Sequence, residues 1–221
     1  MWSEWLDGGM TNLHDVRRDY SGQPLPEDAA AIDPWGLLAQ WVDDALAAGE
    51  PEPTAVTLAT VDEEGRPQAR IVLLKEISPE GLVVFTSYDS AKGQELAARP
   101  VASASFWWPV QIRQVRAVGV VTKLSREASE AYFAKRPRAS QLEAWASEQS
   151  APVASRADLV AAVAAVEERF EGQDVPCPPN WGGYVIDVDS FEFWQGLPSR
   201  LHDRIRCTRT ADGWRNERLQ P

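Results

Sequence analysis

The chain has 221 residues, with 33 acidic and 22 basic side chains and a formal net charge of −11. Nucleic acids and anionic membrane surfaces attract basic faces, so this charge argues against both as partners. Two cysteines and two histidines are too few for a zinc cluster or a His-rich site, so we expect no metal.

The first 32 residues are polar and acidic and show no sustained periodicity, which predicts a flexible N-terminal arm. Its densest cluster is Arg17-Arg18-Asp19-Tyr20, and arms of this kind often fold over a partner. No apolar run approaches the roughly 18 residues that a membrane helix needs. Without a signal peptide, and with two cysteines, the sequence predicts a cytoplasmic protein.

Residues 33–221 are expected to form a single domain, and it begins with a helix. Asp33 is a suitable N-cap and Pro34 suits the first helical position. Apolar residues then recur at helical spacing from Trp35 to Leu46, until Gly49 and Pro51 end the pattern. This segment is predicted to be an amphipathic helix packed on a core.

From Thr54 the periodicity becomes that of strands. Strands are expected at residues 55–60, 69–75, 82–88, 101–108 and 111–124. A turn at residues 62–65 makes the first two a hairpin, and a short helix at residues 94–98 interrupts the series. Five strands at short spacing predict an antiparallel sheet that curls into a barrel.

Helical patterns return in the second half of the chain and are followed by further strands. Helices are expected at residues 126–135, 140–147 and 155–170, and strands at 181–194, 204–209 and 214–219. Strands, then helices, then strands indicate an α+β fold with a mainly antiparallel barrel and flanking helices, and not a doubly wound sheet.

Four basic clusters punctuate the predicted strands and turns: Arg70 with Lys75, Lys92, Arg136 with Arg138, and Arg200 with Arg204. Each cluster is either part of an anion site or a set of solvated surface charges. Lys92 follows Ser90 at a helix start, which suits a phosphate but also an ordinary N-cap. Arg70 and Lys75 are five residues apart, so a regular strand would project them to opposite faces.

Two further arrangements suggest anion binding. Tyr132 lies one helical turn before Arg136, and Ser140 follows a short junction, so the three side chains could converge on a phosphate. Arg200, His202 and Arg204 alternate beside the strand that carries Trp194, and an extended chain would place them on one face. Such a face would suit an anionic aromatic ligand, while solvated arginines are the alternative.

The sequence contains no GxGxxG, GxxxxGK or GxSxG motif, so Rossmann dinucleotide, P-loop and α/β-hydrolase sites lack their usual support. No serine or cysteine has an evident activating base. A bound cofactor that carries the reaction is therefore the favoured hypothesis.

Several motifs from about residue 17 to residue 221 resemble those of the pyridoxine/pyridoxamine 5′-phosphate oxidases, which are FMN enzymes with a split β-barrel. The motifs are RIVLLK at residues 70–75, RPRASQ at 136–141, WASEQS at 145–150, WGGY at 181–184, RLHDR at 200–204 and RLQP at 218–221.

The resemblance implies a homodimer with FMN at the subunit interface. The residues expected to contact FMN are Arg70, Ile71, Val72, Leu73, Lys75, Phe85, Thr86, Lys92, Gln114, Gln149, Ser150, Trp194 and Arg204. Those expected to contact the phosphorylated pyridine substrate are Arg17, Tyr20, Lys75, Tyr132, Arg136, Ser140, Arg200 and His202. Of these, Arg200 and His202 are expected to be catalytic.

The implied reaction oxidises pyridoxine and pyridoxamine 5′-phosphates to pyridoxal 5′-phosphate, a step of vitamin B6 metabolism, while O₂ is reduced to H₂O₂. Two positions depart from the family pattern: Ala91 stands where an arginine is common, and Glu143 where a small residue is common. The alternatives are a related phenazine-type oxidase on another aromatic substrate and a non-catalytic flavin- or pyridoxal-phosphate-binding protein.

Overall fold

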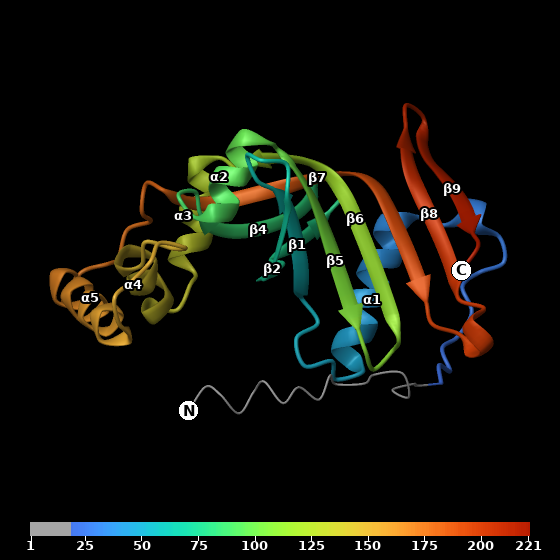
Figure 1. Ribbon diagram of the computed structural model, residues 1–221, viewed down its shortest axis with the longest axis horizontal. Coiled ribbons are helices and arrows are strands. Elements are labelled where there is room, and N and C mark those ends of the chain that lie inside the picture. The colour runs from blue at the N-terminus through green and yellow to red at the C-terminus, as the bar shows by residue number, and fades with distance from the viewer. Residues whose placement is uncertain (1–18) are drawn as a thin grey trace, which may run out of the picture.

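The computed structural model describes residues 19–221, and its core is one antiparallel sheet that curls into a half-barrel (Figure 1). The strands are β1 (Ala55–Val61), β2 (Pro67–Leu73), β3 (Glu76–Ser78), β4 (Gly81–Ser87), β5 (Val101–Trp108), β6 (Arg113–Lys123), β7 (Trp181–Gln195), β8 (Asp203–Thr210) and β9 (Gly213–Leu219). The helices are α1 (Pro34–Ala47), α2 (Ala91–Ala98), α3 (Arg126–Ala134), α4 (Arg138–Ala146) and α5 (Arg156–Arg169), with short 3₁₀ turns at Ala29–Ala31 and Pro198–Arg200. The predicted α+β class and split-barrel architecture are confirmed.

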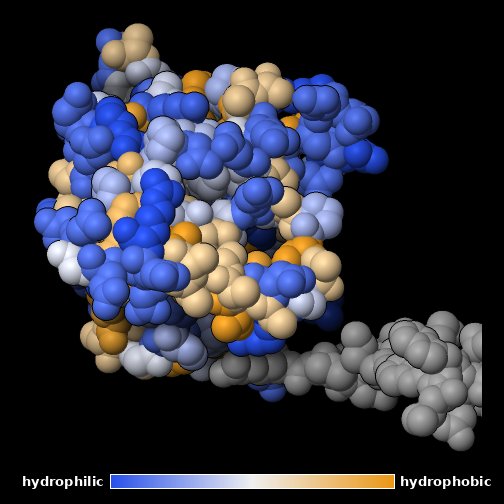
Figure 2. Space-filling model, turned by 90° about the vertical axis from the view of Figure 1, so that its left-hand side faces the viewer, coloured by the Kyte–Doolittle hydropathy of each residue, from blue (hydrophilic) through white to orange (hydrophobic). Residues whose placement is uncertain are grey.

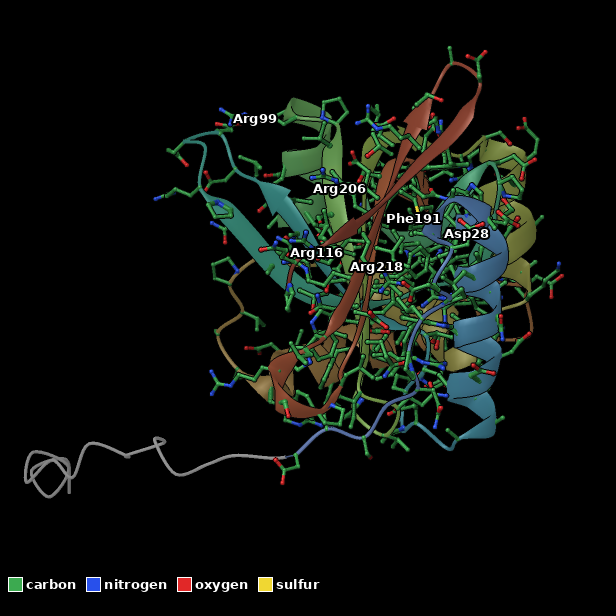
Figure 3. The ribbon with its side chains drawn as sticks, turned by 90° about the vertical axis from the view of Figure 1, so that its right-hand side faces the viewer. Asp28, Arg99, Arg116, Phe191, Arg206 and Arg218 are labelled. Carbon is green, nitrogen blue, oxygen red and sulfur yellow. The ribbon has the colours of Figure 1, made fainter. Side chains whose placement is uncertain are left out.

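The long strand β7 determines how the sheet divides. One edge of β7 pairs with β6 along nearly its whole length. The other edge changes partner along its length. Residues 181–186 of β7 pair with β4, and residues 190–195 pair with β8. The sheet order is therefore β2-β1-β5-β6-β7-β4-β3, with the β8–β9 hairpin attached beside the far half of β7. Figure 3 shows this hairpin, with Arg206 and Arg218 on its two strands.

A bulge in β7 lies opposite Gly119 of β6, where β7 changes partners. The register shifts between Val118 and Gly119, and a Cβ atom on Gly119 would lie 2.0 Å from the carbonyl oxygen of Asp187. Only glycine allows the two backbones to approach so closely. The bulge increases the local twist and lets the strand bend around the barrel.

Helix α1 covers the core, as its periodicity predicts. Asp33 caps it by accepting hydrogen bonds from the backbone N–H groups of Trp35 and Gly36, each at 3.1 Å. Its buried face includes Trp41, whose ring meets Phe193 edge-on at 5.4 Å between centroids. This packing fixes α1 against β7.

Helices α2 to α5 gather at the end of the molecule that lies away from the β8–β9 hairpin (Figure 1). Helix α4 begins at Arg138, two residues earlier than predicted. Helix α5, one of the expected flanking helices, has no buried residue and packs on α4. Within residues 19–221, no helix is both long and apolar enough to cross a membrane.

The strand predicted at residues 69–75 corresponds to β2, which begins and ends two residues earlier. Strand β2 ends at Leu73, and Lys75 donates its backbone N–H to Val83 of β4 at 2.8 Å. The three-residue strand β3 then follows, which no sequence pattern indicated. The chain thus turns between two sheet neighbours within a few residues.

The described part of the predicted arm, residues 19–32, lies against the end of the sheet that carries the β8–β9 hairpin. Gly22 donates to the carbonyl of Gly196 at 3.1 Å. Leu25 donates to Asp203 at 2.8 Å, and the Arg218 guanidinium donates to the carbonyl of Pro26 at 2.7 Å. These contacts tie the segment to β7, β8 and β9.

Candidate functional site

A cavity of about 650 Å³ lies where β2 and β4 face α3 and α4. It is lined by Arg70, Ile71, Val72, Leu73, Lys75, Phe85, Thr86, Lys92, Tyr132, Lys135, Arg136, Pro137, Ser140, Gln149 and Trp181. Five of these side chains are basic and none is a carboxylate. In a chain with a net charge of −11, this is a local concentration of positive charge suited to anions.

Arg70 and Lys75 both line this cavity, although a regular strand would have placed them on opposite faces. The strand ends at Leu73, so the alternation of side chains stops before Lys75. The turn toward β4 then brings Lys75 to the same side as Arg70. The expectation of opposite faces assumed one regular strand from Arg70 to Lys75, and β2 ends before Lys75.

Lys92 is the most buried cation of the cavity, with only 8% of its surface exposed. Its Nζ donates to Thr86 Oγ1 at 3.2 Å and to Ser90 Oγ at 3.4 Å. Burial, and then the nearby charge of Arg70, lower the pKa of Lys92. A desolvated ammonium held only by hydroxyl groups is a favourable partner for a phosphate.

The hydroxyl groups near Lys92 are already engaged. Ser90 caps α2 by accepting from Gly93 N–H at 3.3 Å, and it donates to the carbonyl of Ser87 at 2.7 Å. Thr86 donates to Gln149 Oε1 at 2.8 Å. The Ser90 hydroxyl therefore already donates its proton and caps α2.

Arg136 carries the clearest sign of a missing ligand. Its Nη1 atom is buried and has no hydrogen-bond partner among residues 19–221, and burial lowers the pKa of the guanidinium. The guanidinium lies over the ring of Trp181, 4.7 Å from the centroid. Tyr132 and Ser140 line the same cavity, so the predicted trio does converge around an unsatisfied donor.

One wall of the cavity is aromatic. Phe85 stacks on Tyr132 with centroids 3.9 Å apart and ring planes 15° from parallel, and Trp181 lies 5.5 Å from Phe85 on a similar plane. This arrangement orients Tyr132 beside Arg136, and burial raises the pKa of the Tyr132 hydroxyl. That hydroxyl therefore remains a hydrogen-bond donor at neutral pH.

A second group of predicted residues lies at the other end of β7. Gln114, Trp194 and Arg204 form one cross-strand row on β6, β7 and β8. Arg204 donates to Glu192 Oε1 through Nε at 3.0 Å and Nη2 at 2.8 Å, and Nη1 donates to the carbonyl of Gln220 at 3.0 Å. The C-terminal segment thus helps to orient Arg204.

His202 and Tyr20 lie beside this row. The His202 ring is 4.8 Å from Trp194 and 5.6 Å from Tyr20, centroid to centroid. His202 Nδ1 accepts the backbone N–H of Leu197 at 3.1 Å, so a neutral ring carries its proton on Nε2.

The predicted clamp of Arg200, His202 and Arg204 on one extended face is wrong. Arg200 ends a 3₁₀ turn and has a φ of 62°, so the chain is not extended there. Only Arg204 belongs to a strand. Arg200 is nevertheless exposed and near His202 in the chain, without a partner among the hydrogen bonds and ion pairs of residues 19–221.

Other predicted positions lie near, but not in, the main cavity. Ser150, Ala91 and Gln149 line an adjoining cavity of about 720 Å³, and Gln149 separates the two. Glu143 lines the groove between α4 and α5. Figure 2 shows the end of the molecule that these helices form, where apolar and hydrophilic patches lie side by side. Arg17 lies outside the described residues.

Sequence reasoning did not assign Lys135, Pro137 and Trp181 to the site, although all three line the cavity. Lys135 directly precedes Arg136, so its place in a basic junction was the available signal. Trp181 begins β7 and opens the WGGY motif at residues 181–184, and that motif was the available signal. Within residues 19–221, no group of three or more His, Cys, Asp or Glu side chains could hold a metal ion.

The two groups of predicted residues cannot meet within one chain. Trp181 lies at the first end of β7 and Trp194 near its last residue. A strand rises about 3.3 Å per residue, so these positions are about 40 Å apart along the strand. One small ligand cannot touch both groups unless a second chain supplies one of them.

Comparison with known proteins identifies the family. The family model described as "Pyridoxamine 5'-phosphate oxidase" matches residues 42–170, and that described as "Pyridoxine 5'-phosphate oxidase C-terminal dimerisation region" matches residues 181–221. A protein of Burkholderia lata named pyridoxine/pyridoxamine 5'-phosphate oxidase is 52% identical over 96% of this chain and 100% of its own length. A protein of the same name from Microcystis aeruginosa is 46% identical over 95% and 99%.

Solved structures agree with the fold. PhzG from Burkholderia lata 383, in complex with tetrahydrophenazine-1-carboxylic acid, has a TM-score of 0.85 and 29% identity over 91% of this chain and 100% of that one. A pyridoxamine 5'-phosphate oxidase-related, FMN binding protein from Nostoc punctiforme has a TM-score of 0.70 at 19% identity, over 86% and 100% of the two chains. By its sequence and its fold, the chain belongs to the pyridoxine/pyridoxamine 5′-phosphate oxidase family.

Proposed function

We propose that the protein is an FMN-dependent oxidase that converts pyridoxine and pyridoxamine 5′-phosphates to pyridoxal 5′-phosphate and reduces O₂ to H₂O₂. The observation that carries the proposal is the cavity that joins the predicted flavin residues of β2, β4 and α2 to the phosphate trio of α3 and α4. Relatives with this name are 52% and 46% identical over almost the whole chain.

The residues present fit FMN. Lys92 is a buried cation whose partners are two hydroxyl groups, and Arg70 lines the cavity beside it. Together they would hold the flavin phosphate. The backbone and side chains of residues 71–73, with Phe85 and Thr86, would line the rest of the flavin, as the resemblance implies.

The substrate phosphate would occupy the other side of the same cavity. The buried Nη1 of Arg136 needs an acceptor, because leaving a buried donor unsatisfied costs about 1–3 kcal/mol. A phosphate there would also accept from the Tyr132 and Ser140 hydroxyls and from Lys75. These contacts would fix the position of the pyridine ring.

A second copy of the chain would complete each site. The family model that matches residues 181–221 is a dimerisation region, and the outer face of the sheet is unusually apolar. Ile71, Trp107 and Val118 are 64%, 50% and 47% exposed, although each belongs to a strand. In a two-fold symmetric dimer, such a face can bring the Gln114, Trp194 and Arg204 row of one chain to the cavity of the other.

The chemistry that FMN would supply, when bound, is acceptance of a hydride equivalent and transfer of the electrons to O₂. The protein's contribution is orientation. His202 Nε2–H and the Arg200 guanidinium are donors that would hold the ring and its polar substituents, while the phosphate contacts fix the opposite end. Two fixed ends restrict the reacting carbon to one approach.

The test is an anaerobic half-reaction. Purified protein loaded with FMN is mixed with pyridoxine 5′-phosphate without oxygen, and the visible absorption band of the flavin is followed. We expect the band to bleach and to recover when air is admitted, with pyridoxal 5′-phosphate as product. Unphosphorylated pyridoxine is the matched control and should bleach it far more slowly.

The phenazine-type oxidase is the second candidate, because PhzG shares the fold at a TM-score of 0.85. Bleaching by a reduced phenazine carboxylate, and not by pyridoxine 5′-phosphate, would favour it. A band that neither compound changes would leave a flavin-binding protein without this oxidase activity.

A further inference from the structure

A buried ionic network lies directly behind the flavin-facing wall of the cavity. Arg70 Nη2 donates to Glu95 Oε2 at 2.8 Å. Arg70 Nη1 donates to the Thr60 hydroxyl, which in turn donates to the same Glu95 oxygen. Arg70 lines the cavity, whereas Glu95 and Thr60 do not.

The burial of this network makes it more than a surface ion pair. The Glu95 side chain is 11% exposed and Thr60 is 2% exposed. A carboxylate in such a place is costly unless it is paired. Glu95 belongs to α2, Thr60 to β1 and Arg70 to β2, so the network joins three elements at one point.

The network also leaves part of Arg70 available. Its Nη1 group bonds Thr60 and, at 3.4 Å, the carbonyl of Leu58, and one Nη2 proton reaches Glu95. A guanidinium has five N–H donors in a fixed plane. Holding two sides of that plane determines the direction of the remaining Nε–H and Nη2–H donors.

We infer that Glu95 is the positioning residue of the flavin site: it fixes the Arg70 guanidinium from behind so that its free donors face the flavin phosphate. The inference rests on the proposed function. Glu95 stands one helical turn after Lys92, so α2 presents a cation to the cavity and a carboxylate behind it. Through-space attraction from Glu95 also favours the charged form of Lys92 and partly opposes the lowering of its pKa.

Whether removal of Glu95 tightens or weakens FMN binding distinguishes a positioning role from an effect of its charge alone. Glu95 is negative and close to an anion site, so its removal would tighten FMN binding if only net charge mattered. If Glu95 positions Arg70, its removal weakens binding. Glu95→Gln keeps a hydrogen-bond acceptor for Arg70 and should restore most of the affinity that Glu95→Ala loses.

The experiment is a titration of apoprotein with FMN, followed by quenching of flavin fluorescence. We expect Glu95→Ala to raise the Kd at least about tenfold, since hydrogen bonds to charged groups carry effects of this size. Glu95→Gln should stay within about threefold of wild type. In an Arg70→Ala background, Glu95→Ala should cause almost no further change, because the partner through which it acts is gone.

Asp44→Ala is the matched control. Asp44 pairs with Arg113 at 2.7 Å, between α1 and β6, and neither residue lines the cavity. This variant should bind FMN like wild type, and thermal unfolding of each apoprotein verifies that the variants fold.

Two results would overturn the inference: FMN binding by Glu95→Ala as tight as wild type or tighter, or an undiminished effect of Glu95→Ala in the Arg70→Ala background. Wild-type apoprotein that does not bind FMN would instead contradict the proposed function, and the inference with it. The wild-type titration therefore tests the function, and the comparison of variants tests Glu95.

Discussion

At the scale of single residues, the site combines cations of two kinds. Arg70 and Arg204 each pair with a carboxylate that is largely buried, Glu95 and Glu192. Their charges are largely balanced, so they offer directed donors. In the described part of the chain Lys92 has no carboxylate in direct contact, and it is the cation whose charge an anionic ligand would neutralise.

This difference predicts a pH dependence of FMN binding. The pKa of Lys92 lies below its ordinary value of 10.5 because of burial and Arg70. Between the lowered and the ordinary pKa, the unfolded chain binds more protons than the folded one, so apoprotein stability rises with pH there. A bound phosphate favours charged Lys92, so FMN binding takes up a proton and weakens as pH rises through the lowered pKa.

The measurement is the Kd of FMN between about pH 7 and about pH 10, where arginine does not titrate. We expect log Kd to rise with a slope approaching one per pH unit once Lys92 loses its proton. Lys92→Arg is the control and should flatten this rise. An unchanged slope in Lys92→Arg would assign the pH dependence to another group.

At the scale of elements, the bulged strand β7 and its neighbour β6 create the two places where ligands would contact the sheet. One edge of β7 changes its partner from β4 to β8. The β4 end of the strand therefore borders the cavity, and the β8 end carries Trp194 beside Arg204. The bulge opposite Gly119 is the local feature that permits the strand to bend.

Gly119→Ala should therefore destabilise the fold. The added Cβ would lie 2.0 Å from the Asp187 carbonyl oxygen, and relieving such an overlap costs about 1–3 kcal/mol. Thermal or urea unfolding of the apoprotein measures the effect. Thr122→Val, at an exposed position of the same strand, is the control and should change stability by less than about 0.5 kcal/mol. Equal stability of Gly119→Ala and wild type would show that the backbones can separate at the bulge without cost.

At the scale of the whole molecule, the separation of the two residue groups along β7 makes one chain insufficient. The phosphate trio around Arg136 lies at one end, and Arg200 with His202 lies beyond the other. If each site takes one group from each chain, two different defects placed in different chains still leave one site intact.

This arrangement predicts complementation. Arg136→Ala and Arg200→Ala homodimers should each turn over slowly, and Arg200→Ala should retain its flavin. After the two variants are unfolded together and refolded with FMN, about half of the dimers are mixed and each mixed dimer has one wild-type site, so about a quarter of wild-type activity should return. Refolding each variant alone is the control. Mixed samples no more active than the separate variants would place both groups in a site made by one chain.

Much of the fold was readable from local patterns. Asp33 and Pro34 predicted the start of α1, and the strand pattern at residues 181–194 predicted β7, because capping and side-chain periodicity depend on nearby residues. The short strand β3 and the end of β2 at Leu73 were not readable, because they depend on a hydrogen bond to β4, which lies several residues farther along the chain.

The sequence by itself determined the family, through motifs that keep their order from Arg70 to Pro221, and the residue types of the site. Only the tertiary structure decided which of those residues meet. It brought Arg70, Lys92 and Arg136 to one cavity, separated them from Trp194 and Arg204, and placed Glu95 behind Arg70. The physical reason is that spacing along the chain specifies direction only within one regular element, whereas a site is built where several elements end.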